Sequence, residues 1–194
     1  MALRARDLTV AAVAAAGLVV GAREARNGTL RAAESRCFLF VNGLSDRPFP
    51  FVWTVMQLGS VGGSIATGTA VYAAGRRRLG RRLATVGTLT WAASKAAKPF
   101  AKRGRPASVT ASRVLGREQA GLGYPSGHAG VAVAMASAAA AHVPAVLRPV
   151  LWLTALGIGT SRVYVGAHLP LDVAGGIALG IATERAVRFV RGPA

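Results

Sequence analysis

Three short stretches of this sequence combine residue types that could carry chemistry on a phosphoryl group. Each joins basic or histidine side chains to turn-forming residues, and the stretches are 98–106, 125–128 and 161–172. An arginine guanidinium matches phosphate oxygens in a bidentate way, and a lysine adds a point charge. Negative charge spreads over the phosphoryl oxygens during transfer, so the reaction needs such cations more than anything else. The residue types therefore favour phosphoryl chemistry.

Four side chains in these stretches are candidates for holding the phosphate. Lys98, Arg105 and Arg162 would supply three positive groups, and the Ser126 hydroxyl can donate to a phosphate oxygen. Two predicted helices begin near residues 126–128 and 170, and the first backbone N–H groups of a helix attract anions. Side chains and helix ends would thus act on the same group.

Two histidines and one aspartate could divide the chemical work. His168 and Asp172 are four residues apart across a predicted helix start, so the carboxylate can reach the imidazole. Such a partner fixes the imidazole tautomer and raises its basicity, which suits a nucleophile attacking phosphorus. His128 comes from a different predicted helix and could protonate the leaving oxygen.

The elements that must position these residues are predicted to be membrane helices. Residues 48–75 contain no charge, which exceeds the roughly 20 residues that a spanning helix needs. The other apolar stretches reach that length only when a terminal charge is included, as snorkelling side chains allow. The sequence predicts one all-α domain over 1–194, a polytopic bundle of about six transmembrane helices: 6–25, 50–74, 82–98, 127–143, 148–166 and 170–189.

The alternation of helix directions carries a consequence for the motifs. In the six-helix arrangement all three stretches fall at helix ends on one face of the membrane. The spans themselves follow from apolarity and charge, and not from the motifs. Residues 28–47 mix arginines and a glutamate with leucines and phenylalanines, which is typical of an amphipathic segment on the membrane surface. A single site at one face of the bundle is therefore predicted.

Composition narrows the class of ligand. The chain carries 24 Lys and Arg against 7 Asp and Glu, and its basic residues separate apolar segments instead of forming a soluble basic face. Nucleic acid is therefore not expected as a partner, and anionic lipids or a phosphorylated substrate are. With one cysteine, three histidines and no CxxC or HExxH pattern, a structural zinc site is not expected, and no cofactor is predicted.

Orientation follows from the basic loops. Arginines at 76–78 and 81–82 form the densest loop cluster outside the motifs, on the same side as both termini. The opposite face carries about as many basic residues, but those in or near 95–117 are expected to serve the site. When these are not counted, the positive-inside rule predicts cytoplasmic termini and an extracytoplasmic site in the plasma membrane. The first apolar segment could be a signal peptide, but no clear cleavage site follows it, which favours a retained helix.

At this point the sequence resembles the type 2 phosphatidic acid phosphatase superfamily. Its signature is KxxxxxxRP, PSGH and SRxxxxxHxxxD, and every fixed position is met within 98–172. The resemblance implies that His168 becomes a phosphohistidine, that His128 is the general acid and that Asp172 partners His168. It also implies that no metal is needed and that the phosphate is held by Lys98, Arg105, Ser126, Gly127 and Arg162.

The expected function is that of a membrane lipid phosphatase of the bacterial cell envelope. The substrate would be a polyprenyl phosphate or diphosphate, phosphatidic acid or phosphatidylglycerol phosphate, because little of the chain lies outside the bilayer to recognise a large headgroup. Three alternatives stay open: a phosphotransferase of the same fold, a catalytically silent lipid-binding module, and a haloperoxidase, against which the membrane spans count. The sequence does not indicate the oligomeric state.

Overall fold

A computed structural model describes residues 2–192, and these contain helices and loops but no strand. The all-α prediction is confirmed. The α-helices are α1 (Ala2–Arg26), α2 (Ala32–Asn42), α3 (Phe49–Met56), α4 (Val61–Ala73), α5 (Arg77–Ala101), α6 (Gly127–Ala139), α7 (Arg148–Tyr164) and α8 (Pro170–Arg191).

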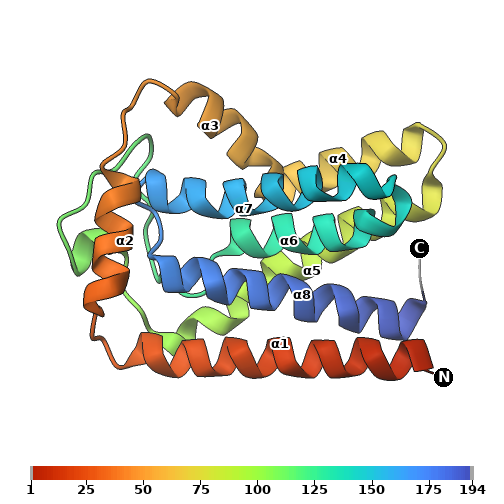
Figure 1. The fold of residues 1–194 in the computed structure, drawn as a ribbon, viewed down its shortest axis with the longest axis horizontal. Helices are drawn as coiled ribbons and strands as arrows, with labels where there is room; N and C mark the ends of the chain where they lie inside the picture. The colour runs from red at the N-terminus through yellow and green to blue at the C-terminus, as the bar shows by residue number, and fades with distance from the viewer. Residues whose placement is uncertain (1, 193–194) are drawn as a thin grey trace.

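Helix α6 is the centre of the bundle and packs against α5, α7 and α8 (Figure 1). Its sequence is mostly alanine, glycine and valine, and nearly every side chain along it is buried. Two glycines of α8 allow the closest approach, since a Cβ at Gly176 would lie 2.4 Å from Ser126 O and one at Gly180 2.3 Å from Gly130 O. This glycine pair therefore serves packing within one chain, as small residues do between membrane helices.

The single predicted helix over 50–74 is wrong, because the chain is broken there into α3 and α4 by a 3₁₀ turn at Gln57–Gly59. Ser60 has extended backbone and its hydroxyl accepts from Gly63 N at 2.9 Å, capping α4. Gly59 lies so close to α6 that a Cβ would be 2.8 Å from His128 O. The cap and this close approach together explain the break.

The other predicted helices are present with shifted ends. Helix α5 begins at Arg77 instead of 82 and continues through Pro99 to Ala101, where Lys102 takes a left-handed conformation (φ 52°). Helix α6 ends at Ala139 and a 3₁₀ turn follows it. Within residues 2–192, one helix, Arg4–Arg26, is long and apolar enough by itself to cross a membrane. The number of six spans stays a prediction.

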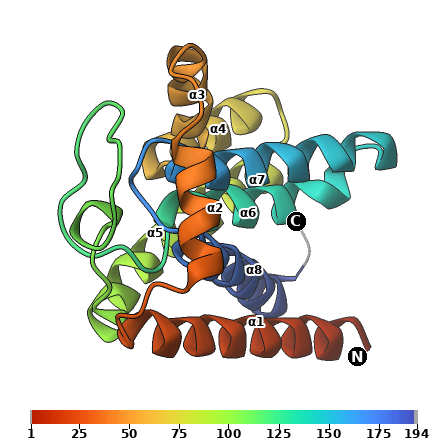
Figure 2. The same cartoon turned by 60° about the vertical axis from the view of Figure 1, so that its left-hand side comes forward.

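The amphipathic segment predicted over 28–47 forms α2, which lies across one end of the bundle (Figures 1 and 2). Phe38 points inward and is fully buried against Val163 and Leu169, while Leu39 and Phe40 are exposed. One face of α2 is thus fixed to the bundle. Its location on a membrane surface stays a prediction.

Helix α1 lies alongside α8 (Figure 1). Asp7 pairs with Arg185 at 3.0 Å and with Arg188 at 3.3 Å, and Leu18 O accepts from Tyr124 Oη at 2.7 Å. These contacts join α1 to α8 and to the loop before α6. The retained first helix stays a prediction. The start of α1 and the end of α8 lie at the same end of the molecule, opposite α2.

Candidate active site

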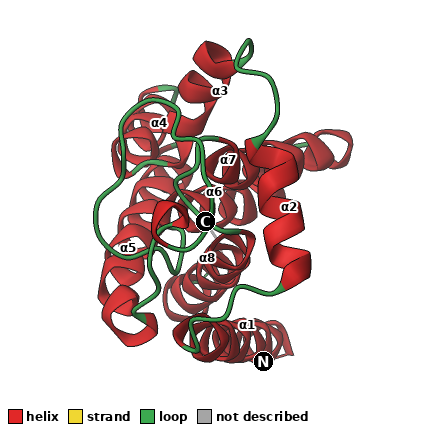
Figure 3. Ribbon diagram, turned by 90° about the vertical axis from the view of Figure 1, so that its left-hand side faces the viewer, coloured by secondary structure: helices red, strands yellow, loops and turns green. Residues whose placement is uncertain are grey.

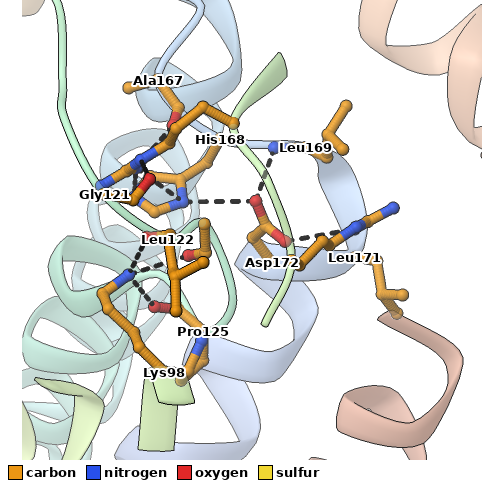
Figure 4. Close-up of polar contacts among 12 residues, drawn as sticks. Lys98, Gly121, Leu122, Pro125, Ala167, His168, Leu169, Leu171 and Asp172 are labelled. Atoms are coloured by element: carbon orange, nitrogen blue, oxygen red, sulfur yellow. Dashed lines mark hydrogen bonds and ion pairs between the residues drawn. The ribbon is translucent and has the colours of Figure 1, made fainter. Parts of the chain in front are cut away.

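The residues of the three motifs come together, since Lys98 contacts Pro125 O, Arg105 contacts His168 and His168 contacts Asp172. They belong to the end of the bundle where α2 and the long loops lie (Figure 3). Lys98 and Arg162 lie in the last turns of α5 and α7, and His128 lies in the first turn of α6. His168 precedes α8, and Asp172 is in its first turn (Figure 4). The convergence predicted from the alternation of helices is therefore seen in the structure.

His168 and Asp172 are neighbours, as their spacing predicted. The Nδ1 of His168 lies 3.4 Å from Oδ2 of Asp172, and both side chains are buried. The same oxygen accepts from Leu169 N at 2.9 Å, which caps α8. The carboxylate is thus held by the backbone of the helix start while it faces the imidazole (Figure 4).

Contacts of the imidazole indicate its tautomer. Arg105 Nη1 lies 3.0 Å from Nε2 of His168, and it also donates to Ala167 O at 2.7 Å. A guanidinium can only donate, so Nε2 must be the acceptor and Nδ1 carries the hydrogen that faces Asp172. The lone pair that a nucleophile needs is therefore on the side of the arginine.

The environment of His168 keeps the imidazole neutral. Burial lowers the pKa of His168 well below its usual range, and the hydrogen bond and charge of Asp172 oppose that shift without overcoming it. Arg105 and Arg162 lower the pKa further. A neutral imidazole keeps its lone pair on Nε2, as nucleophilic attack requires.

Two polar atoms beside the histidine are buried without a partner. Ser126 Oγ and Arg162 Nε find no hydrogen-bond partner among residues 2–192, although Arg162 Nη1 contacts Met56 Sδ at 2.9 Å. A buried polar group left unsatisfied costs about 1–3 kcal/mol. Both groups belong to the predicted phosphate-binding set, and a bound anion would satisfy them.

His128 and Gly127 open α6 directly after Ser126. His128 is half-buried and lies near His168, Arg162 and Arg105. A Cβ at Gly127 would lie 2.9 Å from Ser94 Oγ. The glycine therefore also serves the packing of α6 on α5, beyond the phosphate contact that was expected.

Lys98 contacts the chain instead of open space. Its Nζ donates to Leu122 O at 2.7 Å, to Gly123 O at 3.0 Å and to Pro125 O at 3.3 Å (Figure 4). These contacts use the three hydrogens of the ammonium and tie the loop before α6 to the end of α5. Lys98 thus has a structural role that the sequence did not indicate, alongside the expected charge.

Sequence reasoning missed two charged residues next to Asp172. Arg103 Nη1 lies 3.1 Å from Asp172 Oδ1, and Arg103 also pairs with Glu34 of α2 at 2.7 Å. Arg103 stands between the fixed positions of the first motif, and Glu34 is far away in the chain. Only the burial of a charge within the loop after α5 could have signalled them, and that is not visible in sequence.

Two residues of the long loop between α5 and α6, Arg113 and Tyr124, are engaged in structural contacts. Arg113 pairs with Asp46 and donates to Asn42 O at 2.6 Å and Leu44 O at 2.5 Å, joining the long loop to the end of α2. Burial raises the pKa of Tyr124 to about 12, so its hydroxyl stays protonated and donates to α1. Both residues therefore hold the loop against the helices.

No group of three or more His, Cys, Asp or Glu side chains that could hold a metal ion occurs within residues 2–192. The charged side chains around His168 are Arg105, Arg162 and Asp172. The arrangement offers a neutral nucleophile, several cations and two unsatisfied donors to one group of oxygens. Chemically, it suits transfer of a phosphoryl group to an imidazole nitrogen.

Comparison with known proteins agrees with this chemistry. Residues 79–191 match the sequence pattern of the PAP2 superfamily. The fold is similar to the crystal structure described as the first transmembrane PAP2 type phosphatidylglycerolphosphate phosphatase from Bacillus subtilis, with a TM-score of 0.74 and 19% identity over 92% of this chain and 94% of that chain. No curated protein sequence matches the chain.

Proposed function

Because the chain belongs to the PAP2 superfamily, we propose that it is a membrane lipid phosphatase that works without a metal through a phosphohistidine at His168. One observation carries the proposal: Ser126 Oγ and Arg162 Nε are buried and unsatisfied within residues 2–192, next to a neutral histidine oriented by Asp172. A phosphate would satisfy both donors. The surrounding guanidinium groups would stabilise the charge that its oxygens develop.

In the first step Nε2 of His168 attacks phosphorus, and the bond between phosphorus and the lipid oxygen breaks. His128 donates a proton to that oxygen, so the alcohol or lipid monophosphate leaves neutral at this atom. The Nδ1–H of His168 stays bonded to Asp172, which stabilises the positive charge of the phosphorylated ring. Arg105 leaves Nε2 and contacts the phosphoryl oxygens.

In the second step water attacks the phosphohistidine. His128, now neutral, takes a proton from the water, and the phosphorus–nitrogen bond breaks to regenerate His168 and release inorganic phosphate. The same two histidines thus serve both half-reactions. Arg105, Ser126, Gly127 and Arg162 would hold the phosphoryl group throughout. Lys98, whose hydrogens are bonded to the loop before α6, would add its positive charge to the phosphate-binding set.

The substrate class proposed is a lipid phosphate met at the membrane interface. The similar fold of a protein described as a phosphatidylglycerolphosphate phosphatase supports that lipid as the first to test, before phosphatidic acid or a polyprenyl phosphate or diphosphate. We place the chain in the bacterial plasma membrane, with the site on the extracytoplasmic face and both termini in the cytoplasm. The outer ends of α1 and α8 lie opposite α2, which supports a site and termini on different sides of the membrane, and the basic loops favour cytoplasmic termini.

The test is phosphate release by the purified protein from a panel of these lipids and a water-soluble ester, with EDTA present. We expect release that is abolished in His168→Ala, because the substitution removes the nitrogen that is proposed to attack phosphorus. His142→Ala is the matched control, since His142 lies in the 3₁₀ turn beyond the far end of α6. Normal turnover by His168→Ala, or a loss with EDTA that added metal restores, contradicts the mechanism.

A further inference from the structure

The two carboxylate oxygens of Asp172 have different partners. Oδ2 faces Nδ1 of His168 and the backbone N–H of Leu169. Oδ1 accepts from Nη1 of Arg103 at 3.1 Å. The hydrogen bond to the imidazole is long, at 3.4 Å, so the orientation of the carboxylate depends strongly on what holds its other oxygen.

Arg103 is itself held in place by α2. Its Nη1 lies 3.0 Å from Oε1 of Glu34 and its Nη2 lies 2.7 Å from Oε2, which is a bidentate pair. The side chains are 7% exposed for Arg103, 11% for Glu34 and 0% for Asp172. Buried charges of this kind are costly unless each has its partner, so the three groups depend on one another.

Glu34 also contacts the start of α8 directly. Its Oε1 accepts from Leu171 N at 2.9 Å, one residue before Asp172. The backbone oxygen of Arg103 accepts from Gly123 N at 2.8 Å, next to the loop that leads to His128. Glu34 lies outside residues 79–191, the part of the chain that matches the superfamily. A segment beyond the shared pattern therefore contributes to the site.

We propose that Glu34 and Arg103 are positioning residues for the reaction, which hold Asp172 in line with His168 and set the charge that the imidazole experiences. The inference rests on the proposed function, in which Asp172 orients the nucleophile. Neither residue touches the reacting atoms, and both act through the carboxylate.

The charges explain why both residues are needed. Arg103 alone would neutralise Asp172 and weaken its support of a positive ring on His168, whereas Glu34 returns the net charge of the three groups to −1. Burial alone would lower the pKa of Arg103, but the hydrogen bond to Glu34 and the charge of Asp172 raise it, so the guanidinium stays charged. The other charged or titratable groups around His168 are Arg105, Arg162, His128 and Lys98.

The expected effect of Glu34→Gln follows from this charge. The amide keeps the size of the side chain but leaves Arg103 free to draw Asp172 away from the imidazole. We expect kcat to fall by about tenfold or more, since a buried charge loses its partner. Glu34→Asp, which keeps the charge, should recover part of the loss. Glu24→Gln is the matched control, because Glu24 pairs with Arg31 near the surface.

The experiment measures two properties of these variants in detergent. The first is kcat for the preferred lipid, with Glu34→Gln also placed in an Asp172→Asn background. The second, which needs no turnover, is the ring ¹⁵N spectrum of His168 at neutral pH, assigned from its loss in His168→Ala. If Glu34 acts through Asp172, the double variant is no slower than Asp172→Asn alone, and Glu34→Gln raises the share of the Nε2–H tautomer.

The outcomes separate the two proposals. A His168 spectrum in Glu34→Gln identical to that of the unsubstituted protein overturns the inference, and so does a fall in kcat that persists unchanged in the Asp172→Asn background. A wild-type protein that releases no phosphate counts against the proposed function alone, because the spectrum still shows whether Glu34 controls the tautomer.

Discussion

At the scale of single residues, the proposed chemistry depends on the environment of one imidazole. His168 is buried, accepts from Arg105 on Nε2 and faces Asp172 through Nδ1. The four-residue spacing across a helix start was enough to predict the histidine–aspartate contact. It could not predict Arg105 on the other ring nitrogen, because that contact depends on how the loop after α5 folds back.

The neutral state of His168 has a consequence for pH dependence. Its pKa is lowered from 6.5, so the nucleophilic form persists as pH falls through the range in which an ordinary histidine protonates. We expect kcat/KM for the preferred lipid to hold its value down through pH 6.5 and to decline only at lower pH. The measurement is kcat/KM across pH 4–8 with a folded-state control by circular dichroism at each pH. A loss of activity as the pH falls, centred at 6.5 or above with the fold intact, would contradict the neutral histidine. A loss as the pH rises would instead report deprotonation of His128, the proposed general acid.

At the scale of elements, most of the helices were predictable and one break was not. Long apolar stretches between charged residues placed α6, α7 and α8 within a few residues of their observed bounds. The uncharged run over 48–75 predicts one continuous helix. It gives no sign of the turn at Gln57–Gly59, because that turn depends on the contact of Gly59 with α6 and not on a charge or a proline. The Ser60 cap was a local signal that the prediction did not use.

The site residues also divide into those that nearby sequence predicts and those that depend on contacts with distant parts of the chain. Each motif residue was predicted from its type and spacing, together with the helix ends that apolar patterning can locate. Glu34 was not, since nothing near it in sequence distinguishes it from a solvated residue of an amphipathic helix. The three carbonyl contacts of Lys98 were missed for a similar reason, because they depend on the path of residues 122–125.

The glycine contacts between α6 and α8 lead to a prediction about packing. A methyl group at Gly176 would meet Ser126 O at 2.4 Å, so Gly176→Ala must push α8 away from the first turn of α6. We expect a loss of about 1–3 kcal/mol in stability, as for other overpacked sites. The check is the midpoint of thermal unfolding in detergent. Gly157→Ala is the control, because no atom lies within 4 Å of a Cβ there, and an equal loss in both variants would contradict the argument.

At the scale of the whole molecule, the site lies at one end of the bundle and the outer ends of α1 and α8 lie at the other. Helix α2 covers the site end, while α1 begins and α8 finishes at the other (Figure 1). Charge pairs of Asp7 with Arg185 and Arg188 join α1 to α8 at that far end. If the bundle crosses the membrane, the two ends face different compartments.

This separation gives a direct test of orientation. Cys37 is the single cysteine of the chain and is exposed on α2, at the site end. We expect a membrane-impermeant maleimide to label it in intact spheroplasts, because the site is proposed to face outward. The control is Cys37→Ser combined with Arg77→Cys, which moves the thiol to the start of α5 at the other end and should be labelled only after lysis. The reverse pattern would contradict the proposed topology.

The hydrogen bonds of Lys98 bear on how such a protein could lose its activity in evolution. The lysine ties three carbonyl groups of one loop, so its replacement would disturb the path of the chain as well as the charge near the substrate. His128 makes no comparable backbone contacts. A descendant retained only to bind lipid would therefore be expected to change His128 early and to keep Lys98 long after turnover has disappeared. An intact lysine at this position is then weak evidence of catalytic activity.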